Sequence, residues 1–369
     1  MIKLSEFKIN IDEIVVHNSI ESFALSLISI FIPIFLYNLS YSLNQIYLYY
    51  FIYFLSFSFF CFFSHNFVKL GLKKTLALRP ISLIFFFIWL YSLNNFPNTL
   101  NYLAIYNGLT SAFYWVAFHC FFAVKTNDSN SLERVGVLFS LPKVLTVFSP
   151  ILGGFIITYL GFNPLFFLVS ILLLLSLIPL IKMKDFELDL DFDLKNLFNS
   201  SFVKYFFGFI AEGVYYAVFI ILFPFFVYLY LGKMLDVGFL SFFMSLAGII
   251  APLVISKACE HKTSKFIKIF SLIEGLFFLL VLFVKTSLSA FLLSFVVGIF
   301  ANFWLLPFYS RLYRHSKQNN SRDLLEFMTI KEVILSLSRA SVFLIIYFSS
   351  SFDLVFIINS LSRLLLLFF

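Results

Sequence analysis

Charged residues are scarce in this sequence. They make up 12% of its 369 residues, whereas soluble globular domains carry roughly 25%. Hydrophobic residues make up 61%, and the mean hydropathy is +0.98. So little charge excludes an ordinary soluble domain, and we predict an integral membrane protein.

Cysteines and catalytic motifs are also few or missing. Cys61, Cys120 and Cys259 show no paired or metal-like spacing, which argues against a disulfide framework and a zinc site. The sequence contains no Walker loop, zinc-binding helix motif, nucleophile elbow or glycine-rich dinucleotide motif. ATP-driven pumping and intramembrane hydrolysis therefore have no support. We expect no enzyme activity, no cofactor and no metal.

Long apolar runs recur from one end of the sequence to the other. A helix needs about 20 apolar residues to cross the hydrocarbon core, and twelve segments approach this length. They predict an all-α membrane fold and leave no room for a soluble catalytic domain. The predicted spans cover residues 14–37, 44–63, 75–95, 101–124, 133–160, 164–182, 203–230, 236–256, 265–284, 287–308, 326–348 and 353–368.

The net charge of +7 would suggest a nucleic-acid partner in a soluble protein. Here the basic residues concentrate at alternate ends of the spans, and the other loops hold only Lys233 and Lys285. This asymmetry follows the positive-inside rule. It predicts a multi-pass protein of the cell membrane with both termini in the cytosol, and no nucleic-acid partner.

The sequence contains an internal repeat. Sliding the chain against itself by 191 residues pairs Glu21 with Glu212 and Pro33 with Pro224. A shift of 190 aligns two further segments, in the fourth and tenth spans. Six spans are an even number, so the second half enters the membrane the same way round as the first. The predicted domains are an N-terminal six-helix bundle, 1–182, a cytosolic linker, 183–202, and a C-terminal six-helix bundle, 203–369.

Two pseudo-symmetric six-helix bundles joined by a long cytosolic loop resemble the major facilitator superfamily. A local motif adds to the resemblance. The segment "SHNFVKLGLKKTL" is similar to the superfamily's loop motif between the second and third spans: Gly71 and the basic Lys69 and Lys73 match. Ser64 stands for its first glycine and Val68 for its acid.

A second motif lies in the fifth span. The segment "SPILGGFIITYLGFNPLFF" resembles the superfamily's P-x-x-G-G motif through Pro150, Gly153, Gly154 and Gly161. Small residues allow helices to approach closely. We therefore expect these positions to serve helix packing.

The resemblance implies how the helices are used. Spans one, four, seven and ten would line a central cavity, while spans three, six, nine and twelve would face lipid. The two halves would rock about a site near the membrane midplane. Pro33 and Pro224 would bend the first helix of each half, because proline removes a backbone hydrogen bond.

Acidic residues within the spans are the first candidates for function. Glu21 and Glu212 lie about 9 to 12 Å from the cytosolic ends of their helices, at 1.5 Å per residue. Desolvation on closure of a cavity would favour the protonated carboxyl, as a proton-coupled carrier requires. The alternative is that they pair with cations or helix ends and fix packing. For Glu274 the sequence offers only an inward hydrogen bond or a subunit contact.

The eleventh span carries Lys331, Glu332 and Arg339. Glu332 and Arg339 are seven residues apart and share a helix face, while Lys331 is expected to snorkel to water. Arg339 would bind an anion or pair with Glu332 or Glu212, or else form a purely structural ion pair. Lys143 in the fifth span is the corresponding cation of the first half.

Polar and aromatic residues of the fourth and tenth spans would complete the cavity walls. They are His119, Asn107 and Trp115 in the fourth span and Asn302 and Trp304 in the tenth. A histidine can titrate near neutral pH, but a hydrogen-bonded packing role is preferred for His119.

The favoured function is a secondary active transporter that moves a small solute by alternating access, coupled to protons. Its expected partners are a small-molecule substrate, protons and the lipid bilayer, and the protein is expected to be a monomer. The alternative is a non-transporting membrane protein of the same fold, such as a sensor or lipid-handling protein. A channel is disfavoured, because a two-fold repeat indicates two rocking halves.

Overall fold

The computed structural model describes residues 11–69, 71–125, 144, 146–182, 200–258, 263–318 and 321–369. Within these ranges the chain forms helices and no strand. Lipid offers no partner for a backbone N–H or C=O, so a helix, which bonds its own backbone, is the structure such apolar runs adopt. The first half of the chain forms α1 (Ile11–Ser26), η2 (Ser29–Phe31), α2 (Ile32–Asn38), α3 (Leu43–Cys61), α4 (Ser64–Lys69), α5 (Leu72–Ser92), η3 (Pro97–Thr99), α6 (Leu100–Lys125), α8 (Ser149–Leu160), α9 (Phe162–Leu175) and α10 (Leu177–Lys182).

The second half contains the remaining helices. They are α11 (Ser200–Tyr215), η6 (Tyr216–Leu222), α12 (Phe223–Leu231), α13 (Met234–Ala258), α14 (Thr263–Phe278), η7 (Leu279–Phe283), α15 (Ser287–Gln318), α16 (Ser321–Ser349), α17 (Phe352–Ser362) and η8 (Arg363–Phe368). Eight helical segments of the described chain are long and apolar enough to cross a membrane, and they coincide with eight of the predicted spans. Three of the other four fall on α3, α6 and α17. The fifth predicted span ends on α8, and its residues 133–143 and 145 lie outside the described residues. The total of twelve therefore stays a prediction.

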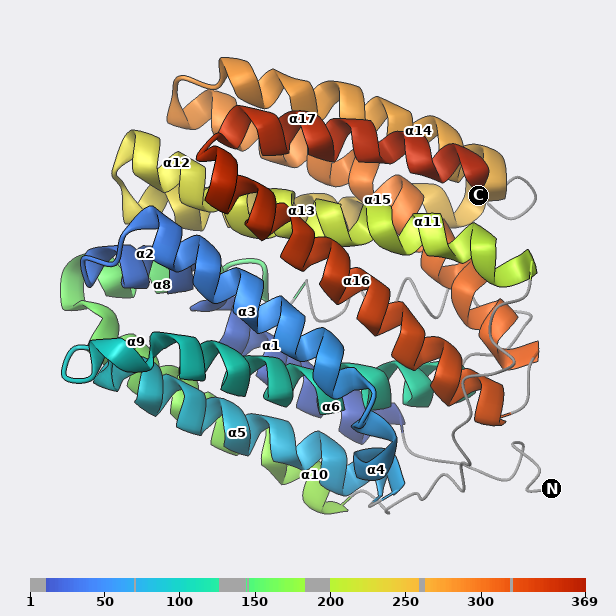
Figure 1. The fold of residues 1–369 in the computed structure, drawn as a ribbon, viewed down its shortest axis with the longest axis horizontal. Coiled ribbons are helices and arrows are strands. Elements are labelled where there is room, and N and C mark those ends of the chain that lie inside the picture. Colours follow the sequence, from blue (N-terminus) through green and yellow to red (C-terminus); the bar gives the residue numbers. More distant parts are fainter. Residues whose placement is uncertain are drawn as a thin grey trace.

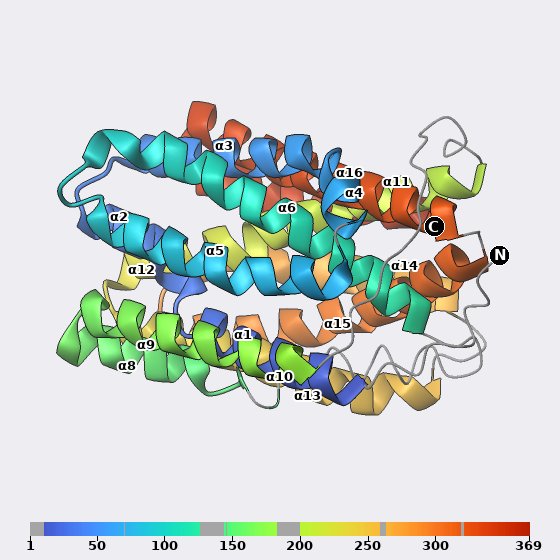
Figure 2. The same cartoon turned by 90° about the horizontal axis from the view of Figure 1, so that it is seen from below.

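The helices lie side by side in one elongated bundle, with most of those of the first half in the lower part of Figure 1 and most of those of the second half above them, while α16 runs obliquely into the lower part. The most extensive contacts between the halves are those of α3 with α16 and of α8 with α13, and α6 also packs against α16 and α15. Figure 2 shows α3 and α16 side by side again from a second direction. The assignment of the halves as two separate bundles stays a prediction.

The first helix of each half is interrupted just before its matching proline. In the first half, the short 3-10 turn η2 separates α1 from α2, which contains Pro33. In the second half, η6 is a π-helix that leads into α12, which contains Pro224. Proline cannot donate to the carbonyl four residues earlier, and π-helical turns occur frequently at functional sites. The repeat in the sequence thus produces a repeated break in the helices.

Candidate functional site

A cavity of about 560 Å³ lies between the two halves of the chain. Its walls come from α1, η2, α2, α3, α5, α6 and α8 of the first half and from α11, η6, α13 and α15 of the second. Most lining side chains are apolar or aromatic, with a few polar groups among them. Cavities of this size and character accept small organic ligands.

The four spans expected around the cavity all contribute to it. Pro33, Asn107, Trp115, Glu212 and Asn302 are among the lining residues. The amide of Asn107 donates to the Tyr49 hydroxyl over 3.2 Å, and that of Asn302 donates to the carbonyl of Gly298 over 2.7 Å.

The expectation that the third span faces lipid is wrong for one side of this helix. Arg79 and Leu83 of α5 line the cavity, although Phe85 and Ile88 on the same helix are 60% and 57% exposed. The physical reason is that Arg79 carries a charge, which is stable inside the protein only beside a partner.

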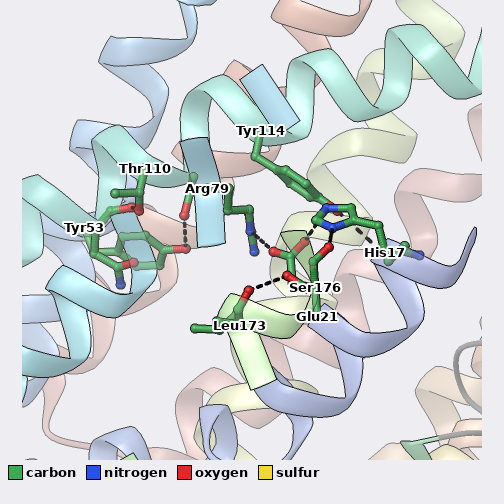
Figure 3. Close-up of polar contacts among 11 residues, drawn as sticks. His17, Glu21, Tyr53, Arg79, Thr110, Tyr114, Leu173 and Ser176 are labelled. Carbon is green, nitrogen blue, oxygen red and sulfur yellow. Dashed lines mark hydrogen bonds and ion pairs between the residues drawn. The ribbon is translucent and has the colours of Figure 1, made fainter. Parts of the chain in front are cut away.

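That partner is Glu21 (Figure 3). Arg79 Nε donates to Glu21 Oε1 over 2.6 Å, and His17 Nε2 lies 3.3 Å from Glu21 Oε2. The other ring nitrogen of His17 contacts the carbonyl oxygen of Ser176 at 2.6 Å. The Arg79 guanidinium also lies over the ring of Tyr114, 4.0 Å from its centroid.

Glu21 is thus held by a cation and a histidine, the arrangement that the packing alternative for this residue describes. It is 2% exposed and is absent from the cavity lining, as far as the described residues show. His17 is not among the residues that the sequence indicates, although residues four apart on a helix share a face. Arg79 is one of the basic residues that the positive-inside pattern assigns to the ends of the spans, but it lies within α5.

Glu212 has a different environment from its repeat partner Glu21. It lines the cavity and accepts a hydrogen bond from the Tyr309 hydroxyl. Its second oxygen, Oε2, is buried and has no hydrogen-bond partner among the residues that the structure describes. Lys331 also lies near Tyr309, with Nζ 5.3 Å from the ring centroid.

A polar network connects α6 of the first half to α15 and α16 of the second. His119 Nδ1 lies 2.6 Å from the Tyr313 hydroxyl, and His119 Nε2 lies 3.2 Å from Glu332 Oε1. Lys331 Nζ donates to the same carboxylate oxygen over 2.6 Å. Lys331 is 0% exposed, so the expectation that it snorkels to water is wrong, because Glu332 satisfies its charge inside the bundle.

Arg339 lies beside the cavity. Its guanidinium stacks 4.3 Å from the ring centroid of Tyr216, which itself lines the cavity. Glu332, the partner suggested by the sequence, pairs with Lys331 and His119 instead. Lys143, the suggested counterpart in the first half, lies outside the described residues.

Another buried ion pair lies in the core of the C-terminal half. Arg363 pairs with Glu274, and both are 0% exposed. The guanidinium also donates to the carbonyl of Ala211 and to Asn359 Oδ1, each over 2.8 Å. This inward pairing accounts for Glu274. Trp304 packs here, with its ring centroid 5.3 Å from the Arg363 guanidinium, and is absent from the cavity lining within the described chain.

The residues of the two sequence motifs lie where helices meet. Gly71 precedes α5 and has a φ of 112°, a conformation that favours glycine. Lys73 Nζ donates to the carbonyl of Ile181 over 3.0 Å. Pro150 lines the cavity, and its carbonyl oxygen would lie 2.6 Å from a Cβ placed on Gly238 of α13.

Gly153 makes the closest backbone contact in this motif. A Cβ placed there would lie 2.0 Å from the carbonyl oxygen of Leu27, whereas one on Gly154 would lie 3.1 Å from that of Met234. Gly153→Ala should therefore lower the free energy of unfolding by about 1–3 kcal/mol or more, because overpacking against backbone forces helices apart. Gly154→Ala is the matched control with a smaller loss. Equal melting temperatures of both variants and wild type in detergent would contradict this.

An all-helical bundle of membrane-spanning length with buried charges beside a cavity between its halves is an architecture that suits a membrane transporter. The family model described as "Major Facilitator Superfamily" matches residues 17–322. The chain therefore belongs to the major facilitator superfamily and is a multi-pass membrane protein. No curated protein sequence matches it.

The fold is also similar to that of a solved transporter. The crystal structure of the human organic anion transporter MFSD10 (TETRAN) superimposes with a TM-score of 0.62, covering 96% of this chain and 98% of that one. The two sequences are 10% identical. At this identity the likeness concerns the fold alone.

Proposed function

We propose that this protein is a secondary active transporter of a small solute, works by alternating access, and couples transport to protons through Glu212. The observation that carries the proposal is the cavity between the two halves, with the buried Glu212 carboxyl in its wall. We also propose that the halves, 1–182 and 203–369, move as two bundles in the cell membrane. Both termini would then lie in the cytosol, as the distribution of basic residues predicts.

Contacts between the halves flank the cavity at two levels. At the level of α2 and α12, the Tyr228 hydroxyl donates to Asn38 Oδ1 over 3.1 Å. Towards the other end of the bundle, His119 contacts Tyr313 and Glu332. Opening one set of contacts while the other persists would expose the cavity to one side at a time, as rigid-body rocking requires.

Glu212 is the carboxyl best placed to carry a proton. It faces the cavity, and its nearest contact is a neutral hydroxyl, that of Tyr309. Glu21 is matched to it by the repeat but is paired with Arg79. A carboxyl without a direct cationic partner can take up a proton without breaking an ion pair.

Cross-linking the α2–α12 contact tests alternating access. In a background without native cysteines, Asn38→Cys and Tyr228→Cys joined by a bifunctional maleimide should reduce transport to background, because the two helices can no longer separate. The readout is counterflow in proteoliposomes with a labelled panel of organic cations, anions, zwitterions and sugars. Each single variant treated with the same reagent is the control. Undiminished counterflow at complete cross-linking would refute alternating access at this contact.

A further inference from the structure

Two side chains of opposite charge, one from each half of the chain, face the same cavity. Arg79 comes from α5 and Glu212 from α11, and both line the cavity. Each is 7% exposed. Each also has a buried polar atom, Arg79 Nη1 and Glu212 Oε2, without a hydrogen-bond partner in the described part of the chain. A buried donor and a buried acceptor that both lack partners indicate a ligand that supplies the complementary groups.

The free atom of Arg79 suits an anionic group. Its Nε is already bonded to Glu21 Oε1, 2.6 Å away, and the guanidinium is held over the Tyr114 ring at 4.0 Å. The side chain is therefore fixed in place while Nη1 remains available. Guanidinium nitrogens form strong, directional hydrogen bonds to carboxylate oxygens.

The free atom of Glu212 suits a cationic group. Its Oε1 accepts from the Tyr309 hydroxyl, and Oε2 is left as an acceptor with no donor among the described residues. A protonated amine carries three donors and no acceptor. Such a group can satisfy Oε2 and neutralise the carboxylate together.

The charges around the cavity balance. Arg79 and Glu21 form one pair, and Lys331, Arg339 and Glu332 all act electrostatically on Glu212. A solute with a net charge would leave one charge uncompensated in a medium of low dielectric constant, which is costly. A solute that carries one positive and one negative group, with no net charge, would leave no charge uncompensated. The groups are three cations and three anions: Arg79, Lys331 and Arg339 against Glu21, Glu212 and Glu332.

We propose that the transported solute is a small zwitterion with an apolar body, an amino-acid-like compound. Its carboxylate binds Arg79 Nη1 and its ammonium binds Glu212 Oε2. The apolar body packs against aromatic walls that include Tyr53, Phe86 and Trp115. This inference rests on the proposed transport function. The Glu212 carboxylate can bind a proton or pair with the ammonium of the solute, but not both at once. The site therefore supports exchange of the solute for a proton.

The test uses two matched series that differ only in charge. One consists of L-phenylalanine, phenethylamine and 3-phenylpropionate, and the other of L-leucine, isoamylamine and 4-methylpentanoate. Binding to the purified wild-type protein is measured by calorimetry, and counterflow in proteoliposomes. In at least one series the zwitterion should bind more tightly than the cation or the anion by about tenfold, the factor expected for one charge-assisted hydrogen bond.

Two variants test which residue binds each end of the solute. Glu212→Gln should shift the preference to 3-phenylpropionate, because the amine loses its partner and the cavity gains net positive charge. The double variant Glu21→Gln with Arg79→Gln removes a complete ion pair and should shift the preference to phenethylamine. Lys285→Gln, at an exposed position near the start of α15, is the control that keeps the wild-type order.

The outcomes separate this inference from the proposed function. If in both series a cation or an anion binds as tightly as the zwitterion, or if neither series binds, the solute class is wrong. Counterflow of another solute from the panel would then leave the carrier function intact. If no solute shows counterflow, the carrier function is wrong. The relative affinities within each series still test the class of solute that the cavity binds.

Discussion

Glu212→Gln should leave the protein folded and remove its response to a proton gradient. The amide keeps the shape of the carboxyl and the contact with Tyr309, but it cannot take up a proton. A gradient of one pH unit supplies about 1.4 kcal/mol per coupled proton, enough for about tenfold accumulation of the solute. Wild-type proteoliposomes should therefore accumulate a transported solute about tenfold per pH unit and coupled proton, and the variant should only equilibrate it.

Tyr309→Phe is the matched control for this prediction. It removes the hydroxyl that donates to Glu212 and keeps the carboxylate. This variant should still accumulate solute when the pH gradient is applied. Proton-driven accumulation by Glu212→Gln at the wild-type level would show that another group couples transport to protons.

The helical architecture is the part that the sequence predicts well. Long apolar runs form helices in lipid, because a helix bonds its own backbone. Within the described residues the predicted spans fall on helices, and eight helical segments are long and apolar enough to cross a membrane. The repeat also located Pro33 and Pro224, and the structure places a helix interruption directly before each. These features are local in the sequence, which is why a sequence pattern can reveal them.

The partners of the buried charges could not be predicted in the same way. Glu21 and Arg79 are 58 residues apart, and Glu274 and Arg363 are 89 apart. No helical periodicity links positions at such separations, and only the packing of the bundle brings them together. The sequence therefore indicated that the charges inside the spans matter, without showing which of them neutralise one another.

The repeat itself was misleading about function in one respect. It matches Glu21 to Glu212 and suggested the same role for both. In the first half the buried arginine pairs with the carboxylate of the first helix, Glu21. In the second half Arg363 pairs with Glu274 of α14, and Glu212 is left facing the cavity. A duplicated scaffold can thus carry one structural carboxylate and one that is available for a ligand.

Breaking the Glu274–Arg363 pair should have the largest effect on stability. Both side chains are 0% exposed, and Arg363 also binds the carbonyl of Ala211 and the amide oxygen of Asn359. Arg363→Met leaves the Glu274 carboxylate buried without its cation, which typically costs about 3–5 kcal/mol. The variant should show a strongly lowered melting temperature in detergent or fail to accumulate as folded protein.

The double variant Glu274→Gln with Arg363→Met distinguishes the charge from the packing. It removes both charges and keeps side chains of similar volume, so no uncompensated charge remains in the core. Because replacing a complete buried pair costs far less than removing one member, its melting temperature should lie closer to wild type than that of Arg363→Met. Both variants lack the hydrogen bonds of Arg363 to Ala211 and Asn359 and differ only in the charge of residue 274, so a double variant less stable than Arg363→Met would contradict the prediction that the uncompensated carboxylate causes the loss.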